Sequence, residues 1–402
     1  MNRNLRQALS ISLSAALIAG TMAGCSEDLG PETLPSTTES TEFEETVIEE
    51  TEPSEETEET SESVEETSHG PMSTPIRSDH PVDINGQLKI DGGKLVNKNG
   101  EQVQLRGIST AGLNKCADIF NENVISTLGY DWGCDTVRLV VVTEGGEDPD
   151  YNKDSETYFN LVCKYADTII DQGLYVIIDW HIKDDGDPMK YKDNAVDFFS
   201  RISAIYGDKE NVIYEICNEP DGKHFDDETK DVTWSRIRKY ANEVIDAIRQ
   251  NDKDNIIICG TPDGCRGIDS VIDKPLKDDN VCYAVHNYTR TEEGDLRDKC
   301  TKAMEAGLCL WASEWTALST EDPSTLDLET ASEWLDYLDT NKICWNNFSI
   351  GNIDYDAADA IMFNSDVLDE EEKIIGHWPQ EFLSDSGVFV KNKLIANAAA
   401  GG

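Results

Sequence analysis

Two carboxylates far apart in the chain each follow an apolar run that is typical of a buried strand. Glu219 comes after residues 212–217 and is followed by Pro220, which has no amide proton and cannot continue a central strand. Glu314 follows a second run, residues 308–312. The carboxyl ends of parallel strands are where active sites form, so we expect the two side chains to meet at one rim. Two carboxylates at one rim are the minimum equipment for cleaving a glycosidic bond.

Other polar and aromatic side chains are predicted to face the same rim. In a barrel, a polar residue that ends an apolar strand points to the mouth. Besides the two carboxylates, this pattern selects Arg138, His181, Asn218, His286, Tyr288 and Trp345. Acidic, basic, amide and aromatic groups converging on one mouth are much less likely by chance than any member alone.

The elements that must position these residues alternate between strand and helix patterns. Apolar runs predict strands at residues 103–108, 136–142, 175–180, 212–217, 256–259, 281–285, 308–312 and 343–348. Apolar residues spaced three and four apart predict helices at 155–171, at 232–251 and near 385–398. Counting one helical segment after each strand, this alternation indicates an α/β fold, a closed (β/α)8 TIM barrel without exposed edges.

Two further observations bear on the fold. A doubly wound open sheet is the structural alternative, but no G-x-G-x-x-G phosphate loop follows the first predicted strand. Residues 84–102 alternate apolar and polar side chains around two glycine-containing turns, which predicts a small hairpin that caps the bottom of the barrel.

Several motifs resemble glycoside hydrolase family 5, the cellulase A family, and in particular its branch of bacterial endo-β-1,4-glucanases. The resemblance covers about residues 83–399. Asn218-Glu219-Pro220 followed by Ser313-Glu314-Trp315 is the most specific part. The other matching segments are 105–108, 131–133, 136–138, 178–181, 187–188, 286–288 and 345–347.

This resemblance implies a retaining endo-β-1,4-glucanase that works by double displacement and needs no metal or other cofactor. Glu219 resembles the general acid/base and Glu314 the nucleophile, with Arg138 as the partner that keeps Glu314 ionised. It also implies that His286 and Tyr288 orient the two carboxylates.

The remaining predicted residues would bind the sugar. Asn218 would bond the 2-hydroxyl, His181 another hydroxyl, and Trp345 would stack on a sugar face. Four of the predicted site residues also have a purely structural alternative. These are a barrel-interior ion pair for Arg138, a capping role for Asn218, and core packing for His181 and Trp345.

The sequence departs from the branch at positions that usually bind more distant sugars. Ala111 replaces a usual histidine, and Ile353 and Tyr355 replace a lysine and a glutamate. We expect Tyr355 to stack on a sugar instead. The sequence therefore leaves the identity of the glycan substrate open. One alternative is the same chemistry on β-mannan, xylan or mixed-linkage β-glucan. Another is a non-catalytic surface glycan-binding protein.

The charge of the chain is strongly negative and unevenly distributed. The formal net charge is -46 over 402 residues, which argues against a nucleic-acid partner and allows a neutral β-glucan. Residues 26–80 are rich in Glu, Thr, Ser and Pro, and such a segment is expected to be a disordered linker. Residues 81–402 then form the catalytic domain, which we expect to be monomeric.

The first 25 residues have the features of an export signal. Two arginines precede an apolar run that is too short to span a bilayer, and Met22-Ala23-Gly24-Cys25 resembles a lipobox. The protein is expected to be extracellular, either secreted or tethered to a bacterial cell surface by a lipidated Cys25. That lipid anchor would be its membrane contact.

The eleven cysteines are distributed in a way that argues against a disulfide framework. Five lie in predicted strands, where a free thiol serves as a small apolar residue: Cys217, Cys259, Cys282, Cys309 and Cys344. Four have more loop-like surroundings and could pair: Cys116, Cys134, Cys265 and Cys300. No Cys-x-x-Cys or His-x3-His spacing indicates a structural zinc site.

Overall fold

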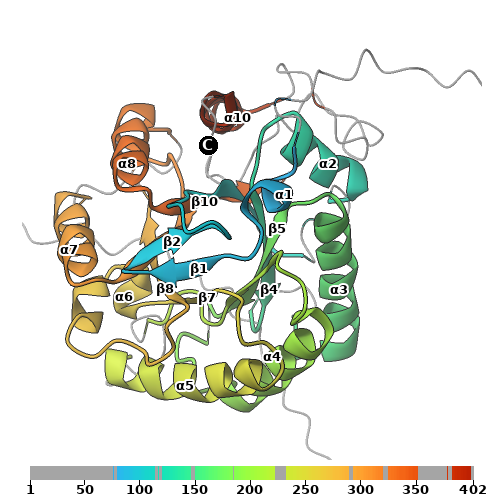
Figure 1. Ribbon diagram of the computed structural model, residues 1–402, viewed down its shortest axis with the longest axis vertical. Coiled ribbons are helices and arrows are strands. Elements are labelled where there is room, and N and C mark those ends of the chain that lie inside the picture. The colour runs from blue at the N-terminus through green and yellow to red at the C-terminus, as the bar shows by residue number, and fades with distance from the viewer. Residues whose placement is uncertain are drawn as a thin grey trace, which may run out of the picture. The chain divides into compact units, whose positions relative to one another are not determined.

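Eight parallel strands form a closed barrel in this computed structural model (Figure 1). The structure describes residue 76 and residues 79–399, with gaps at 114–115, 117–119, 146–149, 184, 222–231, 289–292, 320–324, 352–377 and 379–382. Neighbouring strands follow the order β10-β3-β4-β5-β6-β7-β8-β9, and β10 closes on β3. The predicted (β/α)8 barrel is confirmed.

The strands lie where the apolar runs predicted them, with ends that differ by a few residues. They are β3 (Arg106–Thr110), β4 (Thr136–Val142), β5 (Tyr175–His181), β6 (Val212–Glu215), β7 (Ile257–Cys259), β8 (Val281–Asn287), β9 (Cys309–Trp315) and β10 (Cys344–Ile350). The strand β6 ends earlier than predicted, whereas β8 and β9 extend further and include residues that were expected just beyond them.

Helices surround the barrel on its outer face (Figure 1). They are α2 (Glu122–Tyr130), α3 (Ser155–Asp171), α4 (Lys192–Tyr206), α5 (Trp234–Asn251), α7 (Glu293–Glu305), α8 (Leu328–Asn341) and α10 (Asp385–Ala399). The helix α3 has the predicted bounds, and Asp154 caps it by accepting a hydrogen bond from the backbone N–H of Thr157.

The connection between β7 and β8 differs from the prediction of a full helix after every strand. It contains the short α6 (Pro262–Cys265) and the 3-10 helix η2 (Ile268–Val271). Asp263 and Gly264 both have left-handed backbone angles, with φ near +60°, so a regular right-handed helix cannot propagate through this segment.

Side chains of the strands alternate between two apolar layers. Ile177, Ile213 and Ile258 point into the barrel, where they pack with Trp311 and Cys344. Their sequence neighbours point outward and pack against the helices, as Ile178, Tyr214 and Ile257 do. The parity of a strand residue therefore decides whether its side chain reaches the lumen.

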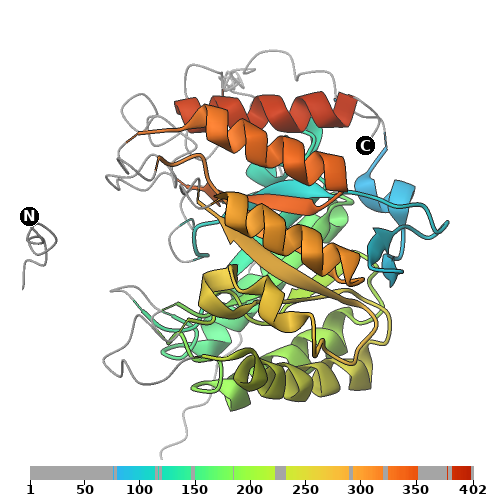
Figure 2. The same ribbon diagram turned by 90° about the vertical axis from the view of Figure 1, so that its left-hand side faces the viewer.

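A short helix and a hairpin close the end of the barrel at which the strands begin (Figure 2). They are α1 (Pro81–Asn85), β1 (Lys89–Asp91) and β2 (Lys94–Val96), and the helix was not predicted. The Tyr175 hydroxyl donates to the Gly86 carbonyl oxygen at 2.6 Å, and Asn280 accepts from the Ile90 N–H at 3.0 Å. Leu88 and Leu95 join the interior apolar layer. The predicted cap at the bottom of the barrel is confirmed, and we call this end the floor.

The cysteines in or beside the strands are buried thiols, as expected. Cys217, Cys259, Cys282, Cys309 and Cys344 carry no disulfide. Cys265 and Cys300 are also free thiols and lie in α6 and α7, not in loops.

The predicted signal, Cys25 and most of the acidic linker fall in residues 1–75, outside the described part of the chain. They stay predictions. The helices that the structure describes include none that is long and apolar enough to cross a membrane.

Candidate active site

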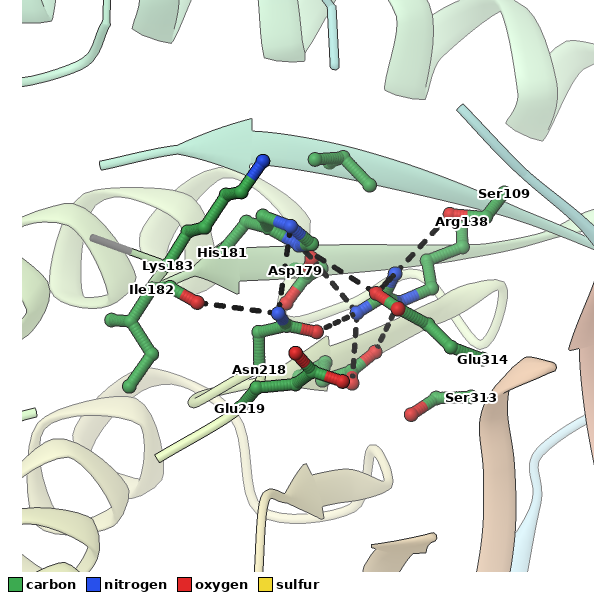
Figure 3. Close-up of polar contacts among 12 residues, drawn as sticks. Ser109, Arg138, Asp179, His181, Ile182, Lys183, Asn218, Glu219, Ser313 and Glu314 are labelled. Carbon is green, nitrogen blue, oxygen red and sulfur yellow. Dashed lines mark hydrogen bonds and ion pairs between the residues drawn. The ribbon is translucent and has the colours of Figure 1, made fainter. Parts of the chain in front are cut away.

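Glu219 and Glu314 meet at the carboxyl end of the barrel (Figure 3). A carboxylate oxygen of each and a ring nitrogen of His286 all lie within 4.8 Å of one another. Glu219 follows β6 by four residues and is partly exposed, whereas Glu314 lies inside β9 and is 1% exposed. The two acidic side chains thus share one space, as the sequence predicted.

A β-bulge in β9 turns Glu314 toward the lumen. Ala284 pairs with Trp311 and His286 pairs with Glu314, so three steps along β9 match two along β8. The ladder between β9 and β10 shows the same extra residue between Ala312 and Trp315. Without it, the alternation that points Ala312 outward would also point Glu314 at the helices. Bulges commonly re-aim a side chain beside an active site.

Arg138 connects the carboxylates from the centre of the barrel. Its guanidinium donates to Glu215 at 2.6 and 3.1 Å, to Glu314 at 2.7 Å and to Asn218 at 2.8 Å. A fourth contact joins it to Asp179 at 2.9 Å. Burial by itself would lower the pKa of Arg138, but the three carboxylates raise it well above its usual value. Its five donors in a rigid fork suit this arrangement better than a lysine would.

Glu314 is held as a carboxylate. Burial would raise its pKa, but Arg138, His286 and His181 lower the pKa to about 2. The Tyr288 hydroxyl also donates a short hydrogen bond to the second oxygen of Glu314. A permanently ionised, oriented carboxylate is what a nucleophile at an anomeric carbon requires.

Glu219 is bound through one oxygen to His286. The distance from His286 Nδ1 to Glu219 Oε1 is 2.7 Å, and the other ring nitrogen lies 2.9 Å from the Ser313 hydroxyl. Burial would lower the pKa of His286, but Cys265, Glu314 and Glu219 raise it well above its usual value. The ring nitrogen of His286 that faces Glu219 is therefore placed to exchange a proton with this carboxyl group.

His181 and Asn218 extend the network to one side of the carboxylate pair. Nδ1 of His181 lies 2.7 Å from Asp179, which fixes the ring, and Nε2 lies 3.4 Å from the Asn218 amide nitrogen. The same amide donates to the Ile182 carbonyl oxygen at 3.2 Å. Five predicted residues, Arg138, His181, Asn218, His286 and Tyr288, thus lie within the network around the two carboxylates.

The prediction that Trp345 presents its ring to a sugar is wrong. Trp345 points outward from β10, is fully buried and packs edge-on against Trp315, with 5.5 Å between ring centroids. Phe348, three residues later and of opposite parity, is half-buried instead. Its ring lies parallel to that of His181, with an interplanar angle of 7°. Phe348, and not Trp345, is therefore the residue of β10 whose ring lies beside the site.

Two buried carboxylates of the network were missed as site residues. Asp179 and Glu215 both contact Arg138 and have no exposed surface. Burial raises the pKa of Glu215, against the lowering by Arg138. A signal was present in the sequence, because a charged residue at a lumen-facing position of an apolar strand needs a buried partner.

Among the residues that the structure describes, Glu219, His286 and Glu314 are close enough to share a metal ion. Their atoms are already engaged: His286 Nδ1 by Glu219, and Glu314 by Arg138 and Tyr288. The trio is therefore satisfied by charge-assisted hydrogen bonds. Of the positions that depart from the resembled branch, Ala111 is half-buried against the outer apolar layer, and Ile353 and Tyr355 lie outside the described residues.

Comparison with known proteins identifies the class of fold and site. A family model described as "Cellulase (glycosyl hydrolase family 5)" matches residues 96–354. Endoglucanase N of Pectobacterium atrosepticum is 36% identical over 323 residues, which are 80% of this chain and 68% of that protein. Endoglucanase A of Evansella cellulosilytica is 38% identical over 304 residues, 75% of this chain and 58% of that one.

Solved structures agree. The catalytic domain of endoglucanase Cel5A from Thermobifida fusca superposes with a TM-score of 0.70 at 29% identity, covering 79% of this chain and 99% of that one. The chain therefore belongs to the cellulase family, glycosyl hydrolase family 5, and is a glycoside hydrolase. It spans between 58% and 68% of the length of the two endoglucanases named above.

Proposed function

We propose that this protein is a retaining endo-β-1,4-glucanase. The observation that carries the proposal is the approach of Glu219 and Glu314, whose oxygens lie within 4.8 Å of each other. Retaining glycosidases hold their two carboxyl groups about 5–5.5 Å apart, whereas inverting ones leave about 6.5–9.5 Å for a water molecule. The short separation favours direct attack by one carboxylate on the sugar.

In the first step, Glu314 attacks the anomeric carbon while Glu219 gives its proton to the leaving glycosidic oxygen. The C–O bond to the leaving sugar breaks, and an ester between the sugar and Glu314 forms. Arg138 and Tyr288 orient Glu314 by donating to separate oxygens. The low pKa of Glu314 keeps it ionised and ready to attack across the working pH range.

In the second step, Glu219 removes a proton from a water molecule that attacks the same carbon. The ester bond to Glu314 breaks, and the carboxylate is regenerated. Two inversions at one carbon retain its configuration. His286, at 2.7 Å from Glu219, is placed to orient that carboxyl group through both steps. Asn218 and His181 are the candidate partners for hydroxyl groups of the reacting sugar, and Phe348 for its apolar face.

Cellulose-type β-1,4-glucan is the substrate that relatives support best. The two relatives named above are endoglucanases. A variant of the Thermobifida fusca enzyme, 28% identical to this chain with a TM-score of 0.70, has been solved with cellotetraose. For this chain we propose action outside the cell on a β-glucan, with Cys25 as the lipid-anchor site.

The stereochemistry tests the mechanism. Proton NMR of the first products released from a soluble β-1,4-glucan should show the β-anomer before mutarotation mixes the signals. An initial α-anomer would rule out double displacement.

Activity measurements test the carboxylates and the substrate. Glu219→Gln and Glu314→Gln should each lower kcat by at least about 10³-fold at unchanged fold, since each removes a group that acts in the transition state. Sugar release should be fastest on β-1,4-glucan in a panel with mixed-linkage glucan, xylan and β-mannan. Faster release from mannan or xylan would reassign the glycan and leave the chemistry in place. Binding without turnover in the wild type would favour a glycan-binding protein.

A further inference from the structure

Two thiols face each other at the floor of the barrel, far from the catalytic carboxylates along their strands. Cys282 on β8 and Cys309 on β9 are direct partners in the parallel register, and their sulfur atoms lie 3.2 Å apart. Both belong to the interior apolar layer. The reaction proposed above uses neither of them.

One of the two thiols borders a cavity. A hollow of about 480 Å³ lies between the turn of the β1–β2 hairpin, α7 and the segments that begin β9 and β10, and Cys309 is part of its wall. Cys309 is 6% exposed and Cys282 is fully buried. Lys94 and Lys342 line the same cavity with one carboxylate, Glu305, so its charged groups carry a positive excess. A small anionic molecule suits this charge, and Cys309 is the cysteine among the residues that line the cavity.

The backbone geometry permits a covalent link between the two cysteines. Neighbouring strands run about 4.7–4.9 Å apart, and disulfide-bonded cysteines have Cα atoms about 4.4–6.8 Å apart. Residues paired directly across a parallel ladder therefore fall within the Cα range of a disulfide, and the two sulfur atoms have to close from 3.2 Å to about 2.05 Å.

We propose that Cys282 and Cys309 form a redox modification site that takes a small anionic disulfide from the floor cavity and ends as a cross-strand disulfide. Cys309, after losing its proton to water in the cavity, attacks one sulfur of the small disulfide. The S–S bond of that molecule breaks, one half leaves as a thiolate, and the other half stays on Cys309. Cys282 gives its proton to the thiolate released first and attacks the Cys309 sulfur, which expels the second half as a thiolate. Two protein thiols are oxidised and one external disulfide is reduced to two thiols, so atoms and electrons balance.

The link would act on stability. It closes a loop between positions 27 residues apart, which contains most of β8 and all of α7. Closing such a loop reduces the entropy of the unfolded chain, and we expect the Tm of the oxidised protein to rise by about 5 °C or more. The active site lies at the other ends of β8 and β9, so kcat should stay within about twofold.

The test uses the full-length protein with oxidised glutathione as the probe. The reduced protein is incubated folded with the probe, quenched in acid, unfolded, alkylated and mapped by mass spectrometry. We expect a cross-linked pair of peptides that contain Cys282 and Cys309. In Cys282→Ala the reaction should stop at a glutathione adduct on Cys309, and in Cys309→Ala neither product should form.

Cys344→Ala is the matched control, because Cys344 lies in the same apolar layer without a register partner of its own type. It should give the cross-link as the wild type does. Wild-type protein in which both Cys282 and Cys309 remain fully alkylatable would overturn the proposal, and this mapping needs no variant to fold. So would an adduct on the half-buried Cys163 of α3 with none on Cys309.

Discussion

At the scale of single residues, one guanidinium organises the site. Arg138 donates hydrogen bonds to two groups that are proposed to act on the sugar: the carboxylate of Glu314 and the side-chain amide oxygen of Asn218. It is itself oriented by Asp179 on β5 and Glu215 on β6. Three buried carboxylates around one cation are stable only while each is hydrogen-bonded. The position of Glu314 therefore depends on residues that never approach the substrate.

Arg138→Lys tests this dependence. A lysine keeps the charge but supplies one ammonium in place of the fork, so Glu314 loses both orientation and part of the interaction that lowers its pKa. We expect kcat to fall at least about 100-fold. The acidic limb of the kcat/KM profile should move to higher pH, because the Glu314 pKa rises toward its usual value.

The control is Arg201→Lys, a surface arginine that is paired with Glu156. It should leave both kcat and the pH profile unchanged. An Arg138→Lys enzyme with the wild-type acidic limb would contradict the assignment of that limb to Glu314.

The aromatic residues of β10 give a second prediction at this scale. Phe348→Ala should raise KM for soluble cello-oligosaccharides about tenfold, or ~1.4 kcal/mol, because an apolar stacking surface is lost. Trp345→Phe should lower Tm and leave KM unchanged, since that ring packs only in the core. The reverse pattern of KM effects would restore Trp345 as the sugar-binding ring.

At the scale of elements, the sequence predicted strands well and the direction of side chains less well. The eight apolar runs located every barrel strand, because burial on both faces requires such runs. Parity alone would have turned Glu314 toward the helices, and only the bulge in β9 brings it to the lumen. A bulge depends on pairing with two neighbouring strands, which no local pattern records. The sequence analysis placed this residue correctly because it expected Glu314 just beyond the end of the strand, and the family resemblance supported that placement; the alternation did not.

Two predictions were wrong because they also ignored local backbone geometry: the sugar-binding role of Trp345 and the full helix between β7 and β8. Trp345 was assigned to the site by residue type, although the lumen-facing positions of β10 are those of Cys344, Asn346 and Phe348. The missing helix between β7 and β8 follows from the left-handed residues Asp263 and Gly264, which a count of strand–helix repeats does not register.

The segment after β5 gives a prediction about pH. Burial raises the pKa of Asp185 to about 6, although hydrogen bonds from the Lys183 N–H and the Thr143 hydroxyl lower it. The Thr143 hydroxyl has one hydrogen and two acceptors, Asp185 Oδ2 at 2.9 Å and the His181 carbonyl oxygen at 3.1 Å. A protonated Asp185 can donate to Thr143 and free that hydrogen for His181.

Because the folded-state pKa lies above the unfolded value, the stability from this group is complete below about pH 4 and is lost as pH rises through 6. Asp185→Asn mimics the protonated form, so it should match the wild type at pH 4. At pH 7 it should be more stable, by at most roughly 3 kcal/mol. Urea unfolding at both pH values measures these free energies of unfolding.

Asp187→Asn, which breaks an ion pair with Arg236, is the control and should not raise the free energy of unfolding at pH 7. A variant that is less stable at pH 7 would refute the account.

At the scale of the whole molecule, the chain divides into two units, residues 1–68 and 69–402. The barrel network described above lies entirely in the second unit. Deletion of residues 2–68 should therefore leave kcat/KM on soluble oligosaccharides within about twofold and Tm within about 2 °C. Calorimetry and initial rates check this. A large fall in Tm would show that the first unit contributes to folding of the barrel.

The chain enters its catalytic unit at the side that faces away from the reacting groups. α1 is hydrogen-bonded to Gly173, just before β5 begins, and the hairpin seals the starts of the strands. An anchor at Cys25, as proposed above, would therefore be joined to the barrel through its sealed side. Such an attachment would not involve the mouth of the barrel, where the proposed polymeric glycan must bind.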